Sequence, residues 1–252
     1  MLITEREFGP FKFVNIYFAK DLSSAELPEY DVLTYHTYNN LGEVEGYEKN
    51  TVLTTVIDLS RDTDSIWNAI KRQHRRHIRR AEQNKTTVSL STDYTKFHEI
   101  YKKFLQQNKY IDLFRLNVLP SQFMQKYGIL FLAENQGEVI GGNLYFHNAQ
   151  HALLVDSVYQ SGENTPEHKK RSTDASCYLY WVAMQYFKDR GIRSFDLGEV
   201  SLGDTEVNSR MNGGEYFKRC FGGMVIPRYT YRQFNNRFNK LLYQSCNYFI
   251  EG

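Results

Sequence analysis

Four acidic residues in the second half of the chain have the chemistry of a general base: Asp156, Asp196, Glu199 and Glu215. Asp196 lies near the end of a predicted strand, 192–198, where sites in α/β proteins often form. Asp156 lies in another predicted strand, 151–159. Either carboxylate can accept the proton that an ammonium group loses when it becomes a nucleophile. Each can equally be a structural hydrogen-bond partner inside the sheet.

A strongly basic segment, KRQHRRHIRR (71–80), has six Lys or Arg in ten residues. Apolar residues at helical spacing around it predict a helix with one buried face. On the other faces, phosphate groups of tRNA or of a nucleotide sugar can be contacted by Arg75, Arg76, Arg79 and Arg80. The alternative is a solvated helix face. Because aromatic residues do not alternate with the basic ones, a stacking platform for single strands is not predicted.

A second basic segment, HKKRSTDAS (168–176), comes just before a predicted long helix, Ser172–Arg190. Free N–H groups and positive side chains at a helix start can hold an anion. We therefore expect donor phosphates to be bound by Lys169, Lys170, Arg171, Ser172 and Thr173. A pyrophosphate, a tRNA 3′ end or a nucleotide-linked acceptor fits this chemistry, and a solvated basic loop is the alternative.

The composition is that of a folded protein with a sizeable core. The chain has 252 residues, of which 41% are hydrophobic and 15% aromatic, and a net charge of +2. A nucleic-acid packaging protein would be far more basic. The three cysteines lack the spacing of metal ligands and the histidines form no ligand cluster, so no metal is predicted. Buried, reduced thiols are expected instead.

The order of the predicted elements indicates an α/β fold. Strands are expected at 11–19, 31–37 and 54–59, then helices at 63–84 and 93–107. Hairpin-length turns separate the next strands, which should form an antiparallel meander at 129–134, 138–147 and 151–159. Within the second of these, Gly141-Gly142 suggests a bulge or a close backbone approach.

After the meander come the long helix, the strand 192–198, a short helix near 215–220, a strand at 224–234 and a closing helix at 236–250. We predict a mixed, mainly antiparallel sheet flanked by helices, with extra N-terminal strands. This order is that of a GNAT acyltransferase, although element order alone does not establish function.

Two sequence blocks resemble the FemABX family, the peptidoglycan-bridge aminoacyltransferases. The first, TTVIDLSRDTDSIWNAIKRQHRRHIRRAEQN (54–84), matches a strand ending in Ile-Asp-Leu, an Ile-Trp helix and an Arg-x-x-Ile-Arg-x-Ala-Glu run. The second is FDLG (195–198) followed by GGEYFKRCFGG (213–223). The resemblance covers roughly residues 50–235 and suggests a single-domain, shortened member.

The resemblance implies a GNAT-like fold and transfer of an acyl group to an amine. In the family the donor is aminoacyl-tRNA and the acceptor is a peptidoglycan precursor. The family's Phe-Lys motif corresponds to Phe217 and Lys218, and it implies that the lysine stabilises charge during aminolysis of the ester. An ammonium group placed at the developing oxyanion would have this effect.

Two alternatives remain open. One is an acetyl-CoA-dependent N-acetyltransferase that acts on a sugar or peptide amine. The other is a non-catalytic GNAT-like module that binds RNA or a nucleotide ligand through residues 71–80. In either enzymatic case no cofactor is bound tightly, and the acyl donor is aminoacyl-tRNA or acetyl-CoA. The acceptor is a small-molecule or peptide amine, and tRNA is a candidate partner.

The predicted division is an N-terminal β-rich extension at 1–50 and a GNAT-like domain at 51–252. The N-terminus lacks the basic start and apolar run of a signal peptide. No apolar stretch approaches the ~20 residues needed to cross a bilayer. A cytoplasmic location without an integral membrane segment is therefore expected.

Overall fold

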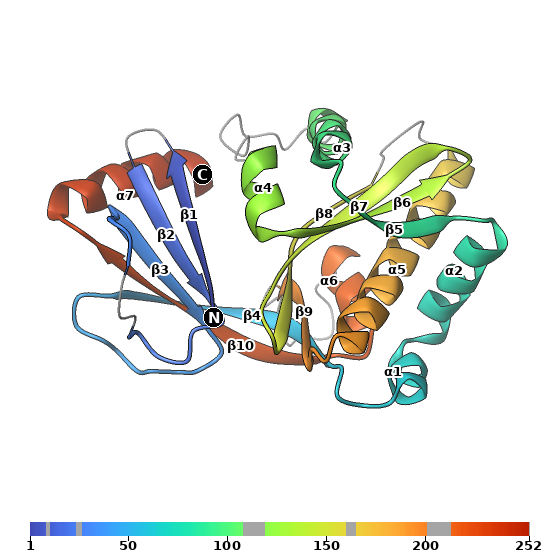
Figure 1. Ribbon diagram of the computed structural model, residues 1–252, viewed down its shortest axis with the longest axis horizontal. Helices are drawn as coiled ribbons and strands as arrows, with labels where there is room; N and C mark the ends of the chain where they lie inside the picture. The colour runs from blue at the N-terminus through green and yellow to red at the C-terminus, as the bar shows by residue number, and fades with distance from the viewer. Residues whose placement is uncertain (9–10, 24–26, 108–118, 160–164, 201–212, 252) are drawn as a thin grey trace. The chain divides into compact units, whose positions relative to one another are not determined.

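The chain forms two compact units. The computed structural model describes residues 1–8, 11–23, 27–107, 119–159, 165–200 and 213–251 (Figure 1). Unit 1 comprises Met1–Thr54 and Ile226–Gly252, and unit 2 comprises Thr55–Val225. The C-terminal segment is thus grouped with the N-terminal residues, whereas the sequence placed it in the GNAT-like domain. The assignment of functional domains stays a prediction.

Unit 1 is a sheet with one helix. Its strands are ordered β1-β2-β3-β10-β4, and β4 and β10 also extend into unit 2. The pairing is antiparallel for β1–β2 and β3–β10 and parallel for β2–β3. The bounds are Leu2–Phe8 (β1), Phe11–Tyr17 (β2), Val32–Thr37 (β3), Glu48–Asp58 (β4), Met224–Phe234 (β10) and Arg237–Glu251 (α7).

Unit 2 contains strands β5 to β9 and the parts of β4 and β10 that lie outside unit 1. Its strands are ordered β4-β9-β8-β7-β6-β5. The neighbours β5–β6, β6–β7 and β7–β8 are antiparallel, whereas β8–β9 is parallel. The bounds are Thr87–Ser91 (β5), Ile129–Asn135 (β6), Glu138–His147 (β7), His151–Tyr159 (β8) and Ser194–Val200 (β9).

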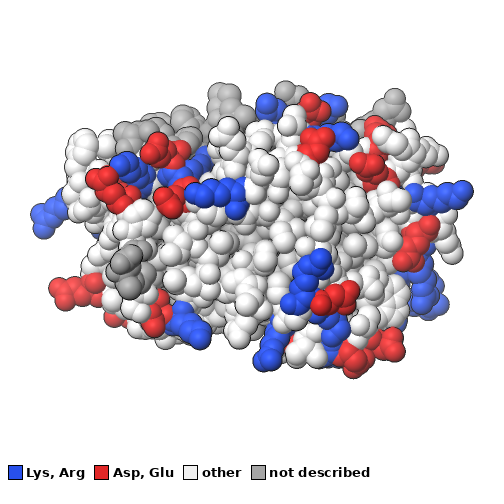
Figure 2. Space-filling model, viewed as in Figure 1, with Lys and Arg blue, Asp and Glu red and all other residues white. Residues whose placement is uncertain are grey.

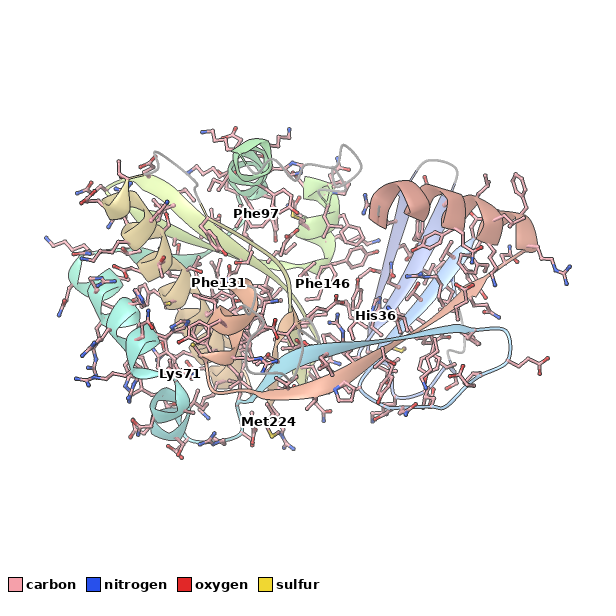
Figure 3. All side chains as sticks on the ribbon, turned by 180° about the vertical axis from the view of Figure 1, so that it is seen from behind. His36, Lys71, Phe97, Phe131, Phe146 and Met224 are labelled. Atoms are coloured by element: carbon pink, nitrogen blue, oxygen red, sulfur yellow. The ribbon has the colours of Figure 1, made fainter. Side chains whose placement is uncertain are left out.

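Helices cover both faces of the unit 2 sheet (Figures 1 and 3). On one face α3 and α4 pack over Leu130, Leu132 and Leu144; on the other, α1, α2 and α5 pack over Phe131 and Tyr145. Since successive side chains of a strand point to opposite faces, both faces of β6 must be apolar. The bounds are Thr63–Ala69 (α1), Arg72–Gln83 (α2), Tyr94–Gln107 (α3), Ser121–Tyr127 (α4), Pro166–Asp189 (α5) and Gly213–Arg219 (α6).

The predicted fold class is confirmed: an α/β fold with a mixed, mainly antiparallel sheet flanked by helices and preceded by extra strands. The glycine pair in β7 also behaves as predicted. A Cβ at Gly142 would lie 2.8 Å from side-chain atoms of Leu132 and Phe97, and a register shift occurs nearby, between Ala133 and Glu134.

Two helices differ from the prediction. The helix expected at 63–84 is broken, because Ile70 and Lys71 have extended backbone angles and the Lys71 N–H donates to the Cys220 carbonyl at 2.8 Å. Asp62 caps the first part by accepting a hydrogen bond from the Ser65 N–H at 2.7 Å. The long helix α5 begins at Pro166 rather than near Ser172. Proline is favoured in the first turn of a helix, where its missing N–H costs nothing.

Candidate functional site

The candidate site forms where β8 and β9 stop pairing. Their parallel register has three pairs, which end at Leu153↔Asp196, although both strands continue beyond these residues. In β8 a register shift against β7 follows at once, because Tyr145 pairs with Leu154 and Leu144 pairs with Asp156. We call this place the β8–β9 fork. It brings Asp156, Asp196 and the Phe-Asp-Leu-Gly motif to the same part of unit 2.

Asp196 is fixed inside the fork. Its side chain is fully buried, and Oδ1 accepts a hydrogen bond from the Gly198 N–H at 2.6 Å. Gly198 has a φ of 83°, which favours glycine because it lies in the left-handed region. The carboxylate of Asp196 therefore stabilises the turn of the strand. This contact agrees with the structural alternative, and a role as base stays a prediction.

Lys218 reaches the fork from α6. Its Nζ donates to the Glu199 carbonyl at 2.8 Å, and a Cβ at Gly198 would lie 3.4 Å from the same nitrogen. The Phe-Asp-Leu-Gly and Phe-Lys motifs, which are separate in the sequence, thus meet in space. An ammonium group held at this strand end can stabilise negative charge that develops on a substrate oxygen.

Phe217 packs in the core and positions α6. Its ring centroid lies 4.8 Å from that of His74 and 5.4 Å from those of Tyr180 and Phe221. Burial, with further contributions from His77 and Lys71, lowers the pKa of His74 to about 4. His74 is therefore neutral at physiological pH, which suits an aromatic cluster. The cluster joins α2, α5 and α6.

The two blocks that carried the family resemblance are in direct contact. Besides the Lys71–Cys220 hydrogen bond, a Cβ at Gly222 would lie 2.7 Å from the carbonyl carbon of Ala69, and one at Gly223 would lie 2.8 Å from the Val56 carbonyl oxygen. The glycines are needed because backbone meets backbone here. The first block thus supports the segment that presents Lys218.

Asp156 has an unusual acidity. Burial raises its pKa to about 6, against hydrogen bonds from Tyr101 and from the Ser157 backbone that act in the opposite direction. It shares a sheet face with its partner Leu144, which packs under α3. A carboxylate with a pKa near 6 is suited to proton transfer near neutral pH.

The arginines of the basic helix α2 differ in their surroundings: Arg80 pairs with a buried carboxylate, whereas others are exposed. Arg80 makes a two-point ion pair with buried Asp174 of α5, with Nε and Nη2 each 2.5 Å from a carboxylate oxygen, and His77 Nδ1 lies 2.7 Å from the same group. Arg80 therefore ties α2 to α5, and its predicted substrate contact stays a prediction.

The other arginines of α2 lie further from the core. Arg75 donates to the Asn68 side chain at 3.1 Å, and the Arg79 guanidinium lies 5.5 Å from the Trp67 ring centroid. Arg76 and Arg79 are exposed. Lys and Arg atoms are visible along the edge of unit 2 where α2 lies (Figure 2), and Lys71 marks the start of that helix (Figure 3). These side chains are available to an anionic ligand.

The segment 169–173 does not form the expected free helix start. It lies within α5, where the Lys169 N–H donates to the Thr165 carbonyl at 3.1 Å and the Thr173 hydroxyl to the Lys169 carbonyl at 2.9 Å. Only the first four N–H groups of a helix lack a helical acceptor, so those of residues 170–173 are committed. Lys169 and Lys170 are exposed, Ser172 is half-buried, and Arg171 lies 3.7 Å from Glu138.

Sequence reasoning missed a buried polar chain beside the fork. The Ser157 hydroxyl donates to the Asn143 side chain at 2.7 Å, and Asn143 donates to the Tyr145 hydroxyl at 2.9 Å. Tyr180 of α5 is hydrogen-bonded to Ser157, and burial raises its pKa well above the usual value. The available signal was a polar residue within each of two otherwise apolar strands.

Three further features of the described residues bear on the kind of site: possible metal ligands, membrane-spanning helices and cysteines. Within the described ranges, no three His, Cys, Asp or Glu side chains group as a metal site requires. Among the helices that the structure describes, none is long and apolar enough to span a bilayer. Cys177 and Cys220 are buried free thiols, in line with the prediction.

Comparison with known proteins supports the fold. No family model and no curated protein matches the sequence. Among solved structures, FemX matches with a TM-score of 0.59 and 12% identity over 96% of this chain and 85% of FemX. L-PGS from Bacillus licheniformis matches with a TM-score of 0.54 and 11% identity over 93% of this chain and 81% of that protein.

A conserved protein of unknown function from Bacteroides thetaiotaomicron gives a TM-score of 0.50 at 9% identity, over 80% of this chain and 69% of that one. The chain therefore has a FemX-like fold. The resemblance to the FemABX family is confirmed at this level.

Proposed function

We propose that the protein is an acyltransferase that moves an activated acyl or aminoacyl group onto an amine. The observation that carries this proposal is the position of Lys218, whose Nζ lies 2.8 Å from the Glu199 carbonyl at the β8–β9 fork. The FemX-like fold supports the same reaction class. The residues assigned to chemistry all lie in unit 2.

In the proposed reaction the acceptor amine attacks the carbonyl carbon of the donor ester, forming a C–N bond and a tetrahedral oxyanion. The ammonium of Lys218 stabilises this oxyanion. The C–O bond to the leaving group then breaks, and the carbonyl is restored. Asp156 accepts the proton lost by the attacking amine and returns it to the departing alcohol oxygen.

We propose aminoacyl-tRNA as the donor in preference to acetyl-CoA. An acetyl-CoA site of the expected kind needs free backbone N–H groups for the pyrophosphate, and those of residues 170–173 lie inside α5. The exposed Arg76 and Arg79 offer charge for tRNA phosphates instead. The acceptor would be the amine of a cell-wall or peptide precursor.

The test is transfer of a labelled aminoacyl group from charged tRNA to amine acceptors, with labelled acetyl-CoA assayed in parallel. Lys218→Ala should lower kcat by about 10²-fold or more, as removal of one oxyanion donor does. Lys96→Ala is the matched control, because Lys96 is an exposed lysine of α3 whose nearest acidic partner lies 3.7 Å away.

Full activity of the Lys218→Ala protein would refute the role of this residue. Activity with acetyl-CoA alone would instead identify an N-acetyltransferase. Salt-dependent RNA binding without turnover of either donor would indicate the non-catalytic module.

A further inference from the structure

The sheet of unit 1 has two chemically different faces. Val14, Ile16, Leu33, Tyr35 and Tyr231 form the apolar face. The residues that alternate with them are mostly polar. Cross-strand pairs show that they share the opposite face, because Thr4 pairs with Asn15, Tyr17 with His36, His36 with Thr230, and Thr34 with Arg232.

Four basic side chains gather on this second face. Arg6 lies two residues beyond Thr4 in β1, and Arg228 two residues before Thr230 in β10, so both join His36 and Arg232. Glu5 and Glu7 of β1 alternate with Arg6 and therefore fall on the apolar side. We call this set the basic face: Thr4, Arg6, Asn15, Tyr17, Thr34, His36, Arg228, Thr230 and Arg232.

The basic side chains are close enough to influence one another. The rings of His36 and Tyr17 stack with centroids 4.4 Å apart and an interplanar angle of 4°. Burial, aided by Arg228 and Arg232, lowers the pKa of His36 to about 3. Burial raises the pKa of Tyr17 to about 12, although Arg228 and Arg6 oppose this change. At neutral pH His36 is uncharged, and the positive charge comes from the arginines.

Two donors on this face lack an acceptor: the Arg232 Nε and the Thr4 hydroxyl are buried atoms without a hydrogen-bond partner among the described residues. The His36 Nε2 lies 3.4 Å from the Asn15 Oδ1, so the neutral ring carries its proton on that nitrogen. Thr4 is fully buried, while His36 and Arg232 remain half-buried. Proteins rarely leave buried donors without an acceptor, so such a cluster is a reason to look for a ligand.

Helix α7 closes one end of the face and orients Arg232. The Tyr243 ring packs against Phe13 and Phe234, with centroids 6.2 and 5.3 Å away, and the Arg232 guanidinium lies 4.7 Å from the Tyr243 centroid. A guanidinium held against a ring loses little further freedom when it binds a planar or tetrahedral oxyanion. His36 lies near the end of β3 (Figure 3).

We propose that the basic face of unit 1 binds an oxyanion, the phosphate or carboxylate group of a small-molecule ligand, with Arg232 and Arg228 as donors. Phosphate and carboxylate oxygens accept hydrogen bonds from guanidinium groups in pairs, and their charge offsets the repulsion within the cluster. The proposal does not depend on acyl transfer, since its residues belong to unit 1.

The experiment measures the melting temperature of the full chain against millimolar inorganic phosphate or acetate, with ionic strength held constant by NaCl. An anion that binds the folded state raises Tm with concentration. We expect such a rise, and amide chemical-shift changes in β3 and β10. Arg232→Gln should weaken the anion affinity about tenfold. Arg237→Gln is the control, because it removes an exposed arginine of α7.

Stabilisation by phosphate alone would show that the ligand binds through a phosphate group. Stabilisation by acetate alone would show that it binds through a carboxylate. Equal anion effects in the wild type, Arg232→Gln and Arg237→Gln proteins would overturn the proposal, as would an equal effect of NaCl. If Arg232→Gln does not fold, Arg232→Lys replaces it. That variant keeps the charge but loses the two-point geometry, so unchanged affinity and unchanged shifts in β10 would again refute the site.

Discussion

Among the described carboxyl groups, Asp156 has a raised pKa, about 6 in place of the usual 3.8. Between these values the folded protein binds more protons than the unfolded chain, so the free energy of unfolding falls as pH rises. The full loss is at most about 3 kcal/mol, from a difference of about two pKa units. Asp156→Asn should remove this loss. Urea unfolding at pH 4.5 and 7.5 would show the variant gaining relative stability at the higher pH.

The same residue makes a kinetic prediction that separates a catalytic role from a structural one. If Asp156 is the base, kcat/KM rises with pH through about 6, where its carboxylate forms. Asp156→Asn should abolish this limb and lower the plateau by about 10²-fold. A variant that keeps both limb and plateau would show that Asp156 is only a partner of Tyr101.

Gly222 tests how the two motif blocks dock. Its φ is 79°, and a Cβ there would press on the backbone of Ala69. Gly222→Ala should therefore destabilise unit 2 by about 1–3 kcal/mol, because the strained conformation and the clash add. Gly214→Ala is the control, since a Cβ at that position meets nothing within 4 Å. Chemical denaturation of both variants measures the difference, and equal stability would contradict the docking.

The ion pair between Arg80 of α2 and Asp174 of α5 predicts how strongly the two helices are held together. Asp174 is buried and binds both Arg80 and His77, so Asp174→Asn leaves the half-buried Arg80 guanidinium without its counter-charge. We expect a loss of about 1.5–3 kcal/mol in the free energy of unfolding, because a charge-assisted hydrogen-bond pair is lost while Arg80 stays partly solvated. Glu138→Gln, which removes the exposed partner of Arg171, should cost less than about 1 kcal/mol. Similar losses in both variants would argue against the α2–α5 tie.

The sequence predicted correctly the bounds of those strands that are defined by residues close to them in the chain. The strands 138–147, 151–159 and 224–234 have the predicted bounds, because turn residues and β-branched side chains define them. The break at Ile70–Lys71 was missed because a carbonyl about 150 residues away fixes it. For the same reason the sequence could not show that Arg80 faces Asp174 in α5, whereas Pro166 could have located the start of α5.

Across the whole molecule, charge is nearly balanced, with 31 Lys and Arg against 29 Asp and Glu. In the proposed reaction with charged tRNA, binding of the donor therefore depends on local groups such as α2, where Arg76 and Arg79 are exposed. Each phosphate contact makes log K fall with log salt, with a slope of about −0.7 to −0.9 per contact.

With charged tRNA as donor, log kcat/KM should fall linearly with log salt. The double variant Arg76→Gln, Arg79→Gln should reduce the magnitude of this slope by about 1.5, because two contacts are lost. The control is Arg237→Gln, on α7 of unit 1. An unchanged slope in the double variant would place the tRNA contacts elsewhere, and a rate independent of salt would argue for a small donor in place of tRNA.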